Sequence, residues 1–515
     1  MSTQTNTQHT SDLIGQRQNR IEKVARLREL GFDPYPSKST RTHTAQEIIN
    51  NYDKLEGKEV TLAGRVMAWR EHGELVFADL RDFSGQVQVY IHLPELPASN
   101  VETQNLGKDH LDLIDLGDHI EVTGTVTKTK RGQISIAPSQ IKMMSKSIRP
   151  LPNKWKGITD PETRFRRRYL DMTMNPDVRE IFTRRSRFWQ AVRDFMNSNG
   201  FIEINTPILE HTTGGADARP FTTHINALDE DLYLRISHEL PLKRLLGGGY
   251  EKVYDIGHRF RNEGFSDEHL PEHIAMEWYW AYADYREGMQ LTEAMFKEIL
   301  QKTFGTLQFN VRGFDIDLEK PWEVYDFTQL LKDRAGVDIF NDSVESMLTV
   351  LNQRGGEIEQ AGDAQPTKPR VVDAIWKTIR REIGGPSFVV GIPKFFSPLA
   401  KTNEENPLLT DRFHPIIAGT EMANAFSELN DPQDQLERFL EQQAMRDAGD
   451  EEAQMLDIDF VEMLEYGMPP AVGFGMSERV FWIFEGVTAR EGTPFPLTRR
   501  HLSGTTKKIY GLWDD

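Results

Sequence analysis

The sequence contains no cysteine in its 515 residues. This absence excludes disulfides, cysteine-ligated zinc, iron–sulfur clusters and thiol nucleophiles, and it suits a reducing compartment. The chain also lacks any run of about 18 apolar residues, and its polar N-terminus lacks the apolar stretch of a signal peptide. We therefore predict a cytoplasmic protein that has no membrane-spanning helix.

An excess of positive charge is lacking too, because the formal net charge is −18. Taken alone, this value argues weakly against a nucleic-acid partner. Local charge matters more, since individual Lys and Arg side chains contact phosphates. Residues 142–168 contain nine basic and two acidic side chains, and four of the arginines crowd into 164–168. A solvated linker and a nucleic-acid-binding segment explain this basic run about equally well.

The first part of the chain predicts a β-barrel that follows an N-terminal extension. Within the extension, 1–58, we expect disorder over 1–20 and a helix over 21–30. Turn residues then separate five β-rich segments, and the gap at 92–117 leaves room for a short helix. Five strands with that interruption match an OB barrel, which binds single-stranded nucleic acid or oligosaccharide. The five segments are 59–70, 75–82, 85–91, 118–129 and 134–144.

The second part of the chain predicts a larger catalytic domain. A basic linker, 146–175, follows the barrel at 59–145, and from 176 to 515 amphipathic helices alternate with strands. A helical insertion is expected at about 340–385. We predict an α+β fold class, with a five-stranded OB β-barrel preceding an antiparallel β-sheet flanked by helices.

Two short strings look like signatures of class I tRNA synthetases. Met144–Ser147 reads MSKS, and Asp255–His258 reads DIGH. A class I site needs these elements in the opposite order within a Rossmann fold. We interpret both matches as chance.

One charged segment, 258–273, has the residues needed to activate a carboxylate with ATP. That reaction requires no enzyme nucleophile, but it requires positioning and cations around the phosphates. Arg261 can sit on the α-phosphate and Glu263 can accept from an adenine amino group. His269 and Arg259 can reach the outer phosphates. Taken alone, the string is also compatible with a charged hairpin tip.

Two segments near the C-terminus supply further candidates. In GFGMSERVFW the glycines allow close backbone approach to a ligand, and Arg479 can stack on a base. In GTEMANAFSELND, Glu421 can bind Mg²⁺ through its oxygens. Glu428 lies among apolar neighbours and therefore needs a cationic partner. Glu421, Asn424 and Glu428 alternate with small or apolar residues, so that one face of a strand can be functional and the other can face the core.

Two more segments complete the candidate site. Gly214–Gly215 permits close backbone approach, and Glu239 follows a strand. In MEWYWAYADY, Glu277 and Tyr279 are two residues apart and so share one face of a strand.

Together these segments resemble class II aminoacyl-tRNA synthetases of the subgroup that charges Asp, Asn and Lys, most closely the bacterial-type lysyl-tRNA synthetases. The resemblance covers residues 20–500 and rests on the strings GGADARPF, FRNEG, AYADY, FSELNDPQDQ and DAGDEEA. It implies ATP-dependent aminoacylation of tRNA(Lys) through a lysyl-adenylate, with one to three Mg²⁺ ions. It also implies a homodimer, with Pro207 of GFIEINTPIL at the dimer interface.

The resemblance also implies a role for each candidate residue. The expected catalytic residues are Arg261 and Arg479. The expected lysine-binding residues are Gly215, Glu239, Arg261, Glu277, Tyr279, Asn424 and Glu428. The expected ATP-binding residues are Arg261, Glu263, His269, His273, Glu421 and Arg479. The expected metal ligands are Glu421 and His414. The expected anticodon contacts are Phe77, Gln88, Arg65 and Arg81.

The chain departs from the family pattern in several places. His414 stands where a metal-binding Glu is usual, and His273 stands where a Phe usually stacks on adenine. Ser477 replaces an aliphatic residue, and Gln133 replaces a frequent Glu. Phe77 itself is also compatible with a barrel-core position.

Alternative functions stay open. Acidic residues at 277 and 428 favour lysine over an Asp- or Asn-tRNA ligase, because a site built for a cation rejects ligands that lack one. A ligase that lysylates proteins would lack the barrel. A catalytically inactive RNA-binding or regulatory paralogue is the remaining alternative.

Overall fold

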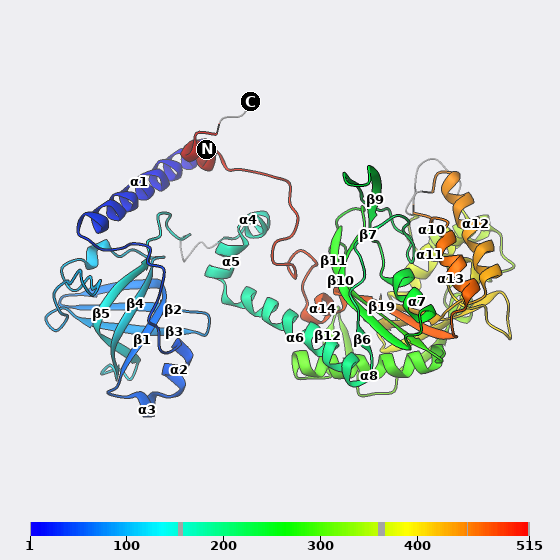
Figure 1. Cartoon of the computed structure of the whole chain (residues 1–515), viewed down its shortest axis with the longest axis horizontal. Coiled ribbons are helices and arrows are strands. Elements are labelled where there is room, and N and C mark those ends of the chain that lie inside the picture. Colours follow the sequence, from blue (N-terminus) through cyan, green and yellow to red (C-terminus); the bar gives the residue numbers. More distant parts are fainter. Residues whose placement is uncertain (1, 153–157, 359–365, 451, 513–515) are drawn as a thin grey trace. The chain divides into compact units, whose positions relative to one another are not determined.

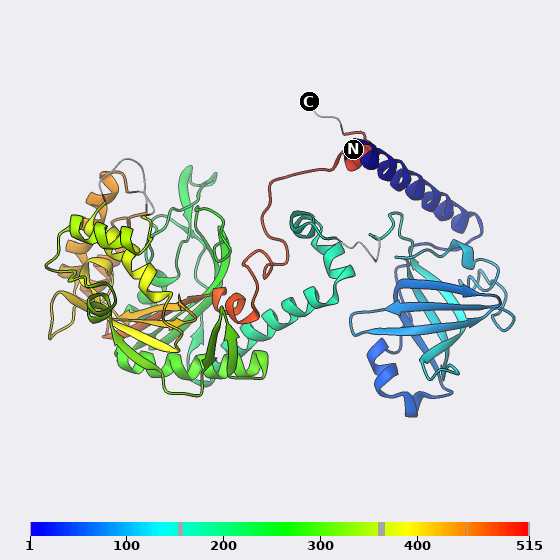
Figure 2. The same cartoon turned by 180° about the vertical axis from the view of Figure 1, so that it is seen from behind.

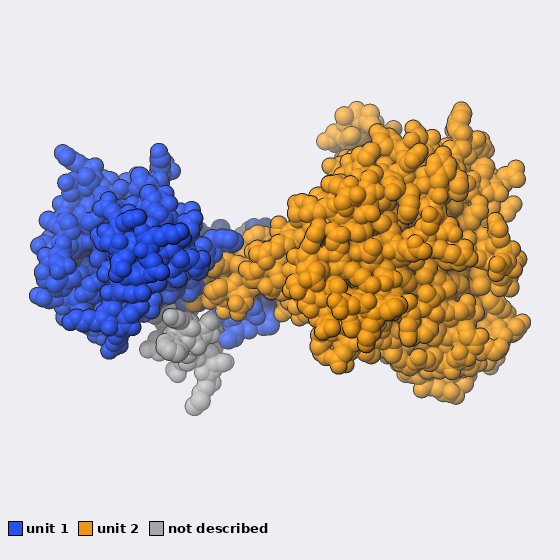
Figure 3. Space-filling view, turned by 90° about the horizontal axis from the view of Figure 1, so that it is seen from below, with its two compact units in different colours: residues 1–170, 498–515 blue, residues 171–497 orange. Residues whose placement is uncertain are grey.

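The structure is a computed structural model that describes residues 2–152, 158–358, 366–450 and 452–512. Two compact units are present, Met1–Leu170 with Thr498–Asp515 as unit 1 and Asp171–Leu497 as unit 2 (Figure 3). The tail from Thr498 thus groups with unit 1, whereas the sequence assigned it to the second domain. Parts of the predicted linker and insertion, 153–157 and 359–365, lie outside the described residues.

Unit 1 contains the predicted barrel (Figure 1). Its strands close in the order β1-β2-β3-β5-β4, and the short helix η1 (Leu111–Leu113) occupies the expected gap. Buried and half-buried residues alternate along β2, so one face fills the barrel core. The OB prediction is confirmed. The strands are β1 (Glu59–His72), β2 (Leu75–Arg81), β3 (Gln86–His92), β4 (His119–Lys128) and β5 (Ile134–Ser145).

Helices occur in the N-terminal extension. Helix α1 spans Ser2–Glu29, so it contains the helix expected at 21–30 and extends into the segment for which the sequence predicts disorder. Its buried Arg20 donates to the carbonyl of Leu116, and its buried Leu27 belongs to the barrel core. Tertiary docking of this kind stabilises the C-terminal part of the helix. Two shorter helices, α2 (Ala45–Asn50) and α3 (Tyr52–Leu55), pack on the same core.

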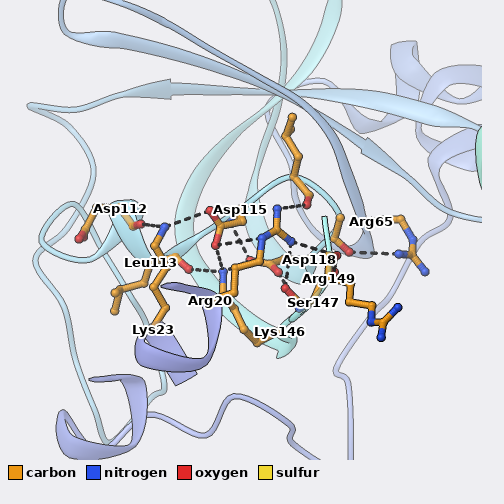
Figure 4. A network of polar contacts seen from close by, with 12 residues as sticks. Arg20, Lys23, Arg65, Asp112, Leu113, Asp115, Asp118, Lys146, Ser147 and Arg149 are labelled. Carbon is orange, nitrogen blue, oxygen red and sulfur yellow. Dashed lines mark hydrogen bonds and ion pairs between the residues drawn. The ribbon is translucent and has the colours of Figure 1, made fainter. Parts of the chain in front are cut away.

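The MSKS string has a structural role in unit 1 (Figure 4). The Lys146 side chain is completely buried; its ammonium pairs with Asp115 and lies 2.7 Å from Asp118 Oδ2. Lys23 of α1 lies 3.0 Å from Asp115 Oδ1. The network therefore joins α1 to the barrel. The DIGH string is structural as well, because buried Asp255 pairs with an arginine at 3.1 Å.

Unit 2 is built on a nine-stranded sheet in the order β14-β15-β16-β18-β19-β11-β10-β6, with β17 paired to β16. The β14/β15 and β10/β6 pairs are parallel and the others antiparallel. This arrangement confirms the α+β fold class. The strands are β6 (Ile202–Glu203), β10 (Lys252–Phe260), β11 (Glu272–Ala281), β14 (Glu323–Asp326), β15 (Ser387–Pro393), β16 (Leu409–Ile417), β17 (Thr420–Glu421), β18 (Ala423–Ser427) and β19 (Ala471–Ser477).

Helices flank this sheet. The long helices α6 (Pro176–Ser198) and α8 (Tyr285–Phe304) pack together and share a large apolar core with the sheet. Helices α10 to α13 gather at one end of it (Figures 1 and 2). None of the described helices is long and apolar enough to cross a bilayer.

The remaining elements are shorter. Helices of unit 2 are α7 (Glu239–Gly247), α9 (Phe327–Ala335), α10 (Val344–Gln353), α11 (Lys368–Arg380), α12 (Pro432–Asp447), α13 (Ile458–Tyr466), α14 (Arg479–Glu485) and η2 (Lys394–Phe396). Small sheets are formed by β7 (Leu209–Glu210), β8 (Thr222–Ile225) and β9 (Glu230–Leu234), and by β12 (Gln308–Val311) and β13 (Phe314–Asp317). The other helices are α4 (Pro161–Arg166), α5 (Arg168–Met174) and α15 (Gly504–Tyr510).

Candidate active site

A cavity of about 300 Å³ lies within unit 2, over strands β11, β16, β18 and β19. Every residue that the sequence predicted for the catalytic site lines this cavity except Glu428. The predicted residues in its wall are Gly215, Glu239, Arg261, Glu263, His269, His273, Glu277, Tyr279, His414, Glu421, Asn424 and Arg479.

Strand register brings the distant segments of the site together. In the sheet, Gly475 of β19 is paired with Glu277 of β11 on one side and with Asn424 of β18 on the other. A Cβ added to Gly473 would lie 2.4 Å from a ring carbon of Tyr279, which is too close for a real side chain. The glycines of GFGMSERVFW are therefore needed to make room for the site's own side chains as well as for a ligand.

Glu277 is held by a set of donors at one end of the cavity. Its Oε1 accepts from Ser237 Oγ at 2.8 Å, His238 N at 3.1 Å and Arg259 Nη1 at 3.1 Å. Tyr279 Oη donates to Oε2 at 3.1 Å. Burial raises the pKa of Glu277, but the hydrogen bonds and charges of His238, Arg259 and Ser237 lower it well below its usual range. Glu277 is therefore an anion in the folded protein.

Lys243 on α7 is a functional residue that the sequence reading missed. Its ammonium is completely buried, lies 2.6 Å from Glu239 Oε1 and pairs with Glu428. Lys243 is thus the cationic partner that we expected for Glu428 because of its apolar neighbours. The carboxylate of Glu428 rests against Gly473, where an added Cβ would lie 2.1 Å from its Oε1. Glu428 thus stands next to the cavity wall rather than in it.

Buried charges are grouped at this end of the cavity. The carboxylates of Glu239, Glu277 and Glu428 lie with the cations Lys243 and Arg259, and the charge of Arg412 also acts on Glu239. Burial raises the pKa of Glu428 well above its usual value, although the charge of Lys243 opposes this shift. A further cation entering here would keep all three carboxylates ionised.

Arginines dominate the other side of the cavity. The Nε atoms of Arg261 and Arg479 are buried and have no hydrogen-bond partner within the described parts of the chain. Arg479 Nη2 donates to the backbone carbonyl of Glu421 at 2.7 Å, which orients its guanidinium. Buried donors without partners are uncommon in proteins and suit a ligand rich in acceptors, such as a phosphate.

Arg259, which the sequence assigned to the outer phosphates, lines the cavity and has protein partners there. It pairs with Glu277, and its Nε donates to His273 Nε2 at 3.3 Å. The other ring nitrogen of His273 lies 3.2 Å from the carbonyl of Leu270, so Nδ1 carries the hydrogen. Burial and the charges of Arg259 and Arg261 hold the pKa of His273 well below its usual value. His273 is therefore a neutral ring in the cavity wall.

The candidate metal ligand Glu421 already has protein partners. Its Oε1 accepts from Trp376 Nε1 and lies 3.3 Å from Arg380 Nη1 and 3.5 Å from His414 Nδ1. Burial lowers the pKa of His414, which keeps the imidazole neutral. Within the described ranges no three acidic or histidine side chains are grouped to hold a metal ion. Glu421 and the neighbouring His414 are the side chains at this wall that would hold a Mg²⁺ ion, which would supply positive charge there.

Two missed residues carried signals in the sequence. Lys243 follows Glu239 by four residues in a helical segment, which places both on one helix face. Arg412 precedes His414 by two residues on β16, and it donates from Nε to Asn424 Oδ1 at 2.8 Å. Both spacings can be read from the sequence. The partners on other elements, Glu428 for Lys243 and Asn424 for Arg412, cannot.

The predicted anticodon residues lie on the barrel strands. Phe77 is half-buried on the outer face of β2, so it is not a core residue, and its ring lies 5.5 Å from that of Tyr90. Gln88 occupies the same face of neighbouring β3, directly across from residue 79. Arg81 ends this face of β2, whereas Arg65 donates to the carbonyl of residue 117 at 3.2 Å, beside the Lys146 network (Figure 4).

The largely antiparallel sheet with its arginine-lined cavity, preceded in the chain by an OB barrel, agrees with the class II aminoacyl-tRNA synthetases that the sequence resembles. The family profile described as tRNA synthetases class II (D, K and N) matches residues 160–499, and the profile of the OB-fold nucleic acid binding domain matches 60–144. The chain belongs to this class II (D, K and N) family.

Named relatives share almost the whole chain. The lysine–tRNA ligase of Thermotoga maritima is 43% identical over 495 residues, which cover 94% of this chain and 96% of the relative. The lysine–tRNA ligase of Carboxydothermus hydrogenoformans is 44% identical over 492 residues, which cover 93% and 97%.

Proposed function

We propose that this chain is a lysine–tRNA ligase, which activates lysine with ATP and transfers the lysyl group to tRNA(Lys), releasing pyrophosphate and then AMP. One observation carries the proposal: three buried carboxylates, those of Glu239, Glu277 and Glu428, are grouped at one end of the cavity. Lysine carries two ammonium groups at neutral pH, so the ligand and this acidic end of the cavity complement each other. The two named relatives are lysine–tRNA ligases.

The same cavity provides the parts that adenylation needs. Arg261 neutralises the charge that develops on the α-phosphate when the lysine carboxylate attacks it, and Asn424 helps to hold that carboxylate. Glu239 and the backbone at Gly215 receive the α-ammonium. Glu277 and Tyr279 receive the ε-ammonium, while Glu428 acts through Lys243. Catalysis follows from fixed positions and fixed charges, without a covalent enzyme intermediate.

The nucleotide occupies the arginine side of the cavity in this proposal. Arg479 and the neutral ring of His273 flank the base, Glu263 accepts from its amino group, and His269 reaches the outer phosphates. Mg²⁺, when bound, supplies further positive charge to the phosphates, and Glu421 holds it.

Unit 1 supplies recognition of tRNA. The half-buried ring of Phe77 offers a stacking surface for an anticodon base, and Gln88 offers hydrogen-bonding groups beside it. Arg81 adds a positive charge along the same strand edge. Arg65 is held toward residue 117, so it supports this face indirectly.

We also propose a homodimer that acts in the cytoplasm. Apolar side chains around Pro207 are exposed although they are large: Ile202 is 53%, Ile208 41% and Leu209 47% accessible. Apolar residues gathered in this way mark an interaction surface. Light scattering on the purified chain should give twice the chain mass of 59.2 kDa, and a monomer at micromolar concentration would count against this assembly.

Pyrophosphate exchange tests the proposed reaction. With each of the twenty amino acids, with and without tRNA, we expect ATP–pyrophosphate exchange for lysine alone. Exchange with aspartate or asparagine would instead indicate the other ligases of the subgroup. Retained tRNA binding without exchange for any amino acid would indicate the inactive RNA-binding paralogue.

A further inference from the structure

The helical insertion reaches the nucleotide side of the cavity. Helix α11 of the insertion carries Trp376 and Arg380 one turn apart, and both contact Oε1 of Glu421. Glu421 lines the cavity, whereas the two insertion residues stand outside its wall. The insertion therefore holds the one acidic side chain on which a metal ion at this wall depends.

Arg380 is a cation fixed beside the cavity. Its guanidinium lies 3.3 Å from Glu421, its side chain is only 22% accessible, and its buried Nε has no hydrogen-bond partner among the described residues. Its positive charge also lowers the pKa of Arg479, after the larger effect of burial and against the opposing charge of Glu268. The field of Arg380 thus reaches the arginine that faces the nucleotide.

A second metal-binding carboxylate is missing at this wall. His414 has an imidazole where the resembled family usually has a glutamate. The guanidinium of Arg380 thus lies against Glu421, in surroundings where a divalent cation would otherwise balance two carboxylates. With an imidazole at position 414 in place of a carboxylate, and with Arg380 beside Glu421, the local charge is balanced by fewer divalent ions.

We propose that Arg380 is a built-in cation of the nucleotide site, which occupies Glu421 from the insertion side and reduces the number of divalent ions that the site binds. The inference rests on the proposed function only for the identity of the nucleotide. It gives the insertion a role in tuning metal dependence.

Two binding measurements with opposite expected signs test this role. Mn²⁺ binding is followed by electron paramagnetic resonance with the non-cleavable analogue α,β-methylene-ATP, corrected for the analogue alone. Analogue binding without divalent ions is measured by calorimetry in EDTA. Arg380→Met should bind Mn²⁺ about tenfold more tightly, because Glu421 loses its competing cation, and should bind the metal-free analogue about tenfold more weakly. Damage to the fold would weaken both.

Matched variants sharpen the test. The exposed neighbour Arg381→Met should leave both affinities within about twofold, and Arg380→Lys, which keeps the charge, should restore most of the wild-type behaviour. His414→Glu should raise the number of Mn²⁺ ions per site above the single ion expected for the wild type. Unchanged Mn²⁺ affinity in Arg380→Met, or two bound ions in the wild type, would overturn the inference. Failure of the wild type to bind the analogue in any condition would overturn the proposed function itself.

Discussion

At the scale of single residues, the site is a balance of buried charges. Glu277 is the only one of its three carboxylates whose pKa is held well below the usual value, since donors surround it. Lys243 must serve both Glu239 and Glu428. In the proposed function, specificity for an ammonium ligand depends most directly on Glu277.

Replacing Glu277 by Gln should remove that charge with little change in shape. We expect lysine-dependent exchange to fall about 100-fold or more in kcat/KM, because Arg259 is left without its anion and the acidic end of the cavity loses a negative charge. The affinity for ATP should stay within about threefold. The exposed Glu272→Gln on the same strand is the matched control, and an equal loss there would argue against the assigned role.

At the scale of elements, charged contacts attach the segments of unit 1 to one another. Lys146 at the end of the barrel joins Asp115 and Asp118, and α1 adds Lys23 to the same cluster (Figure 4). Asp118 has a raised pKa because burial outweighs the charge of Lys146. Removing the lysine would leave the buried Asp118 without this cation, whereas the half-buried Asp115 keeps Lys23.

Lys146→Met should destabilise unit 1 by about 3–5 kcal/mol, the usual cost of breaking a buried ion pair. Hydrogen exchange should show faster opening of the barrel strands and of α1, with lysine-dependent pyrophosphate exchange in unit 2 unaffected. Lys58→Met, at an exposed lysine just before β1, should change neither. Unaltered exchange of the barrel amides would contradict the role of the network.

The stability of unit 1 should also depend on pH through His119, at the start of β4. Burial and the charge of Arg65 lower the pKa of His119 from 6.5 to about 4. The unfolded chain therefore binds this proton more readily, and stability should fall as pH decreases from about 6.5 to 4. His119→Asn should flatten the pH profile of chemical unfolding across this window, whereas the exposed His501→Asn should not.

At the scale of the whole molecule, the two units carry the two sets of proposed site residues. The cavity and the residues proposed for adenylation belong to unit 2, while the predicted anticodon residues belong to unit 1. A change on the barrel face should consequently affect the tRNA step alone.

Phe77→Ala should lower kcat/KM for tRNA in lysine transfer by about 5- to 150-fold, the equivalent of 1–3 kcal/mol of stacking. Lysine-dependent pyrophosphate exchange without tRNA should be unchanged. Phe77→Tyr keeps an aromatic surface and should retain most charging activity. Equal losses in both assays would show that the ring supports the fold and not the RNA.

The sequence by itself determined the features that depend on neighbours along the chain. Turn residues between β-rich segments predicted the barrel strands, paired glycines predicted close approach in β19, and the spacing of Glu277 and Tyr279 predicted a shared face. These patterns are local, so they are readable without the fold. Apolar spacing also predicted the part of the N-terminal helix that contains Leu27, whereas its contacts with the barrel became visible only in the structure.

Only the tertiary structure decided which charges meet. Lys243 pairs with Glu428, and Arg380 with Glu421, across elements that are far apart in sequence or join only through the sheet. Arg259 pairs with Glu277, although its sequence motif gave no sign of this partner. A buried carboxylate is stabilised by a nearby cation, and only the fold determines which cation is near. Pairing among buried charges is a long-range property, because it is set by packing and the low polarity of the interior.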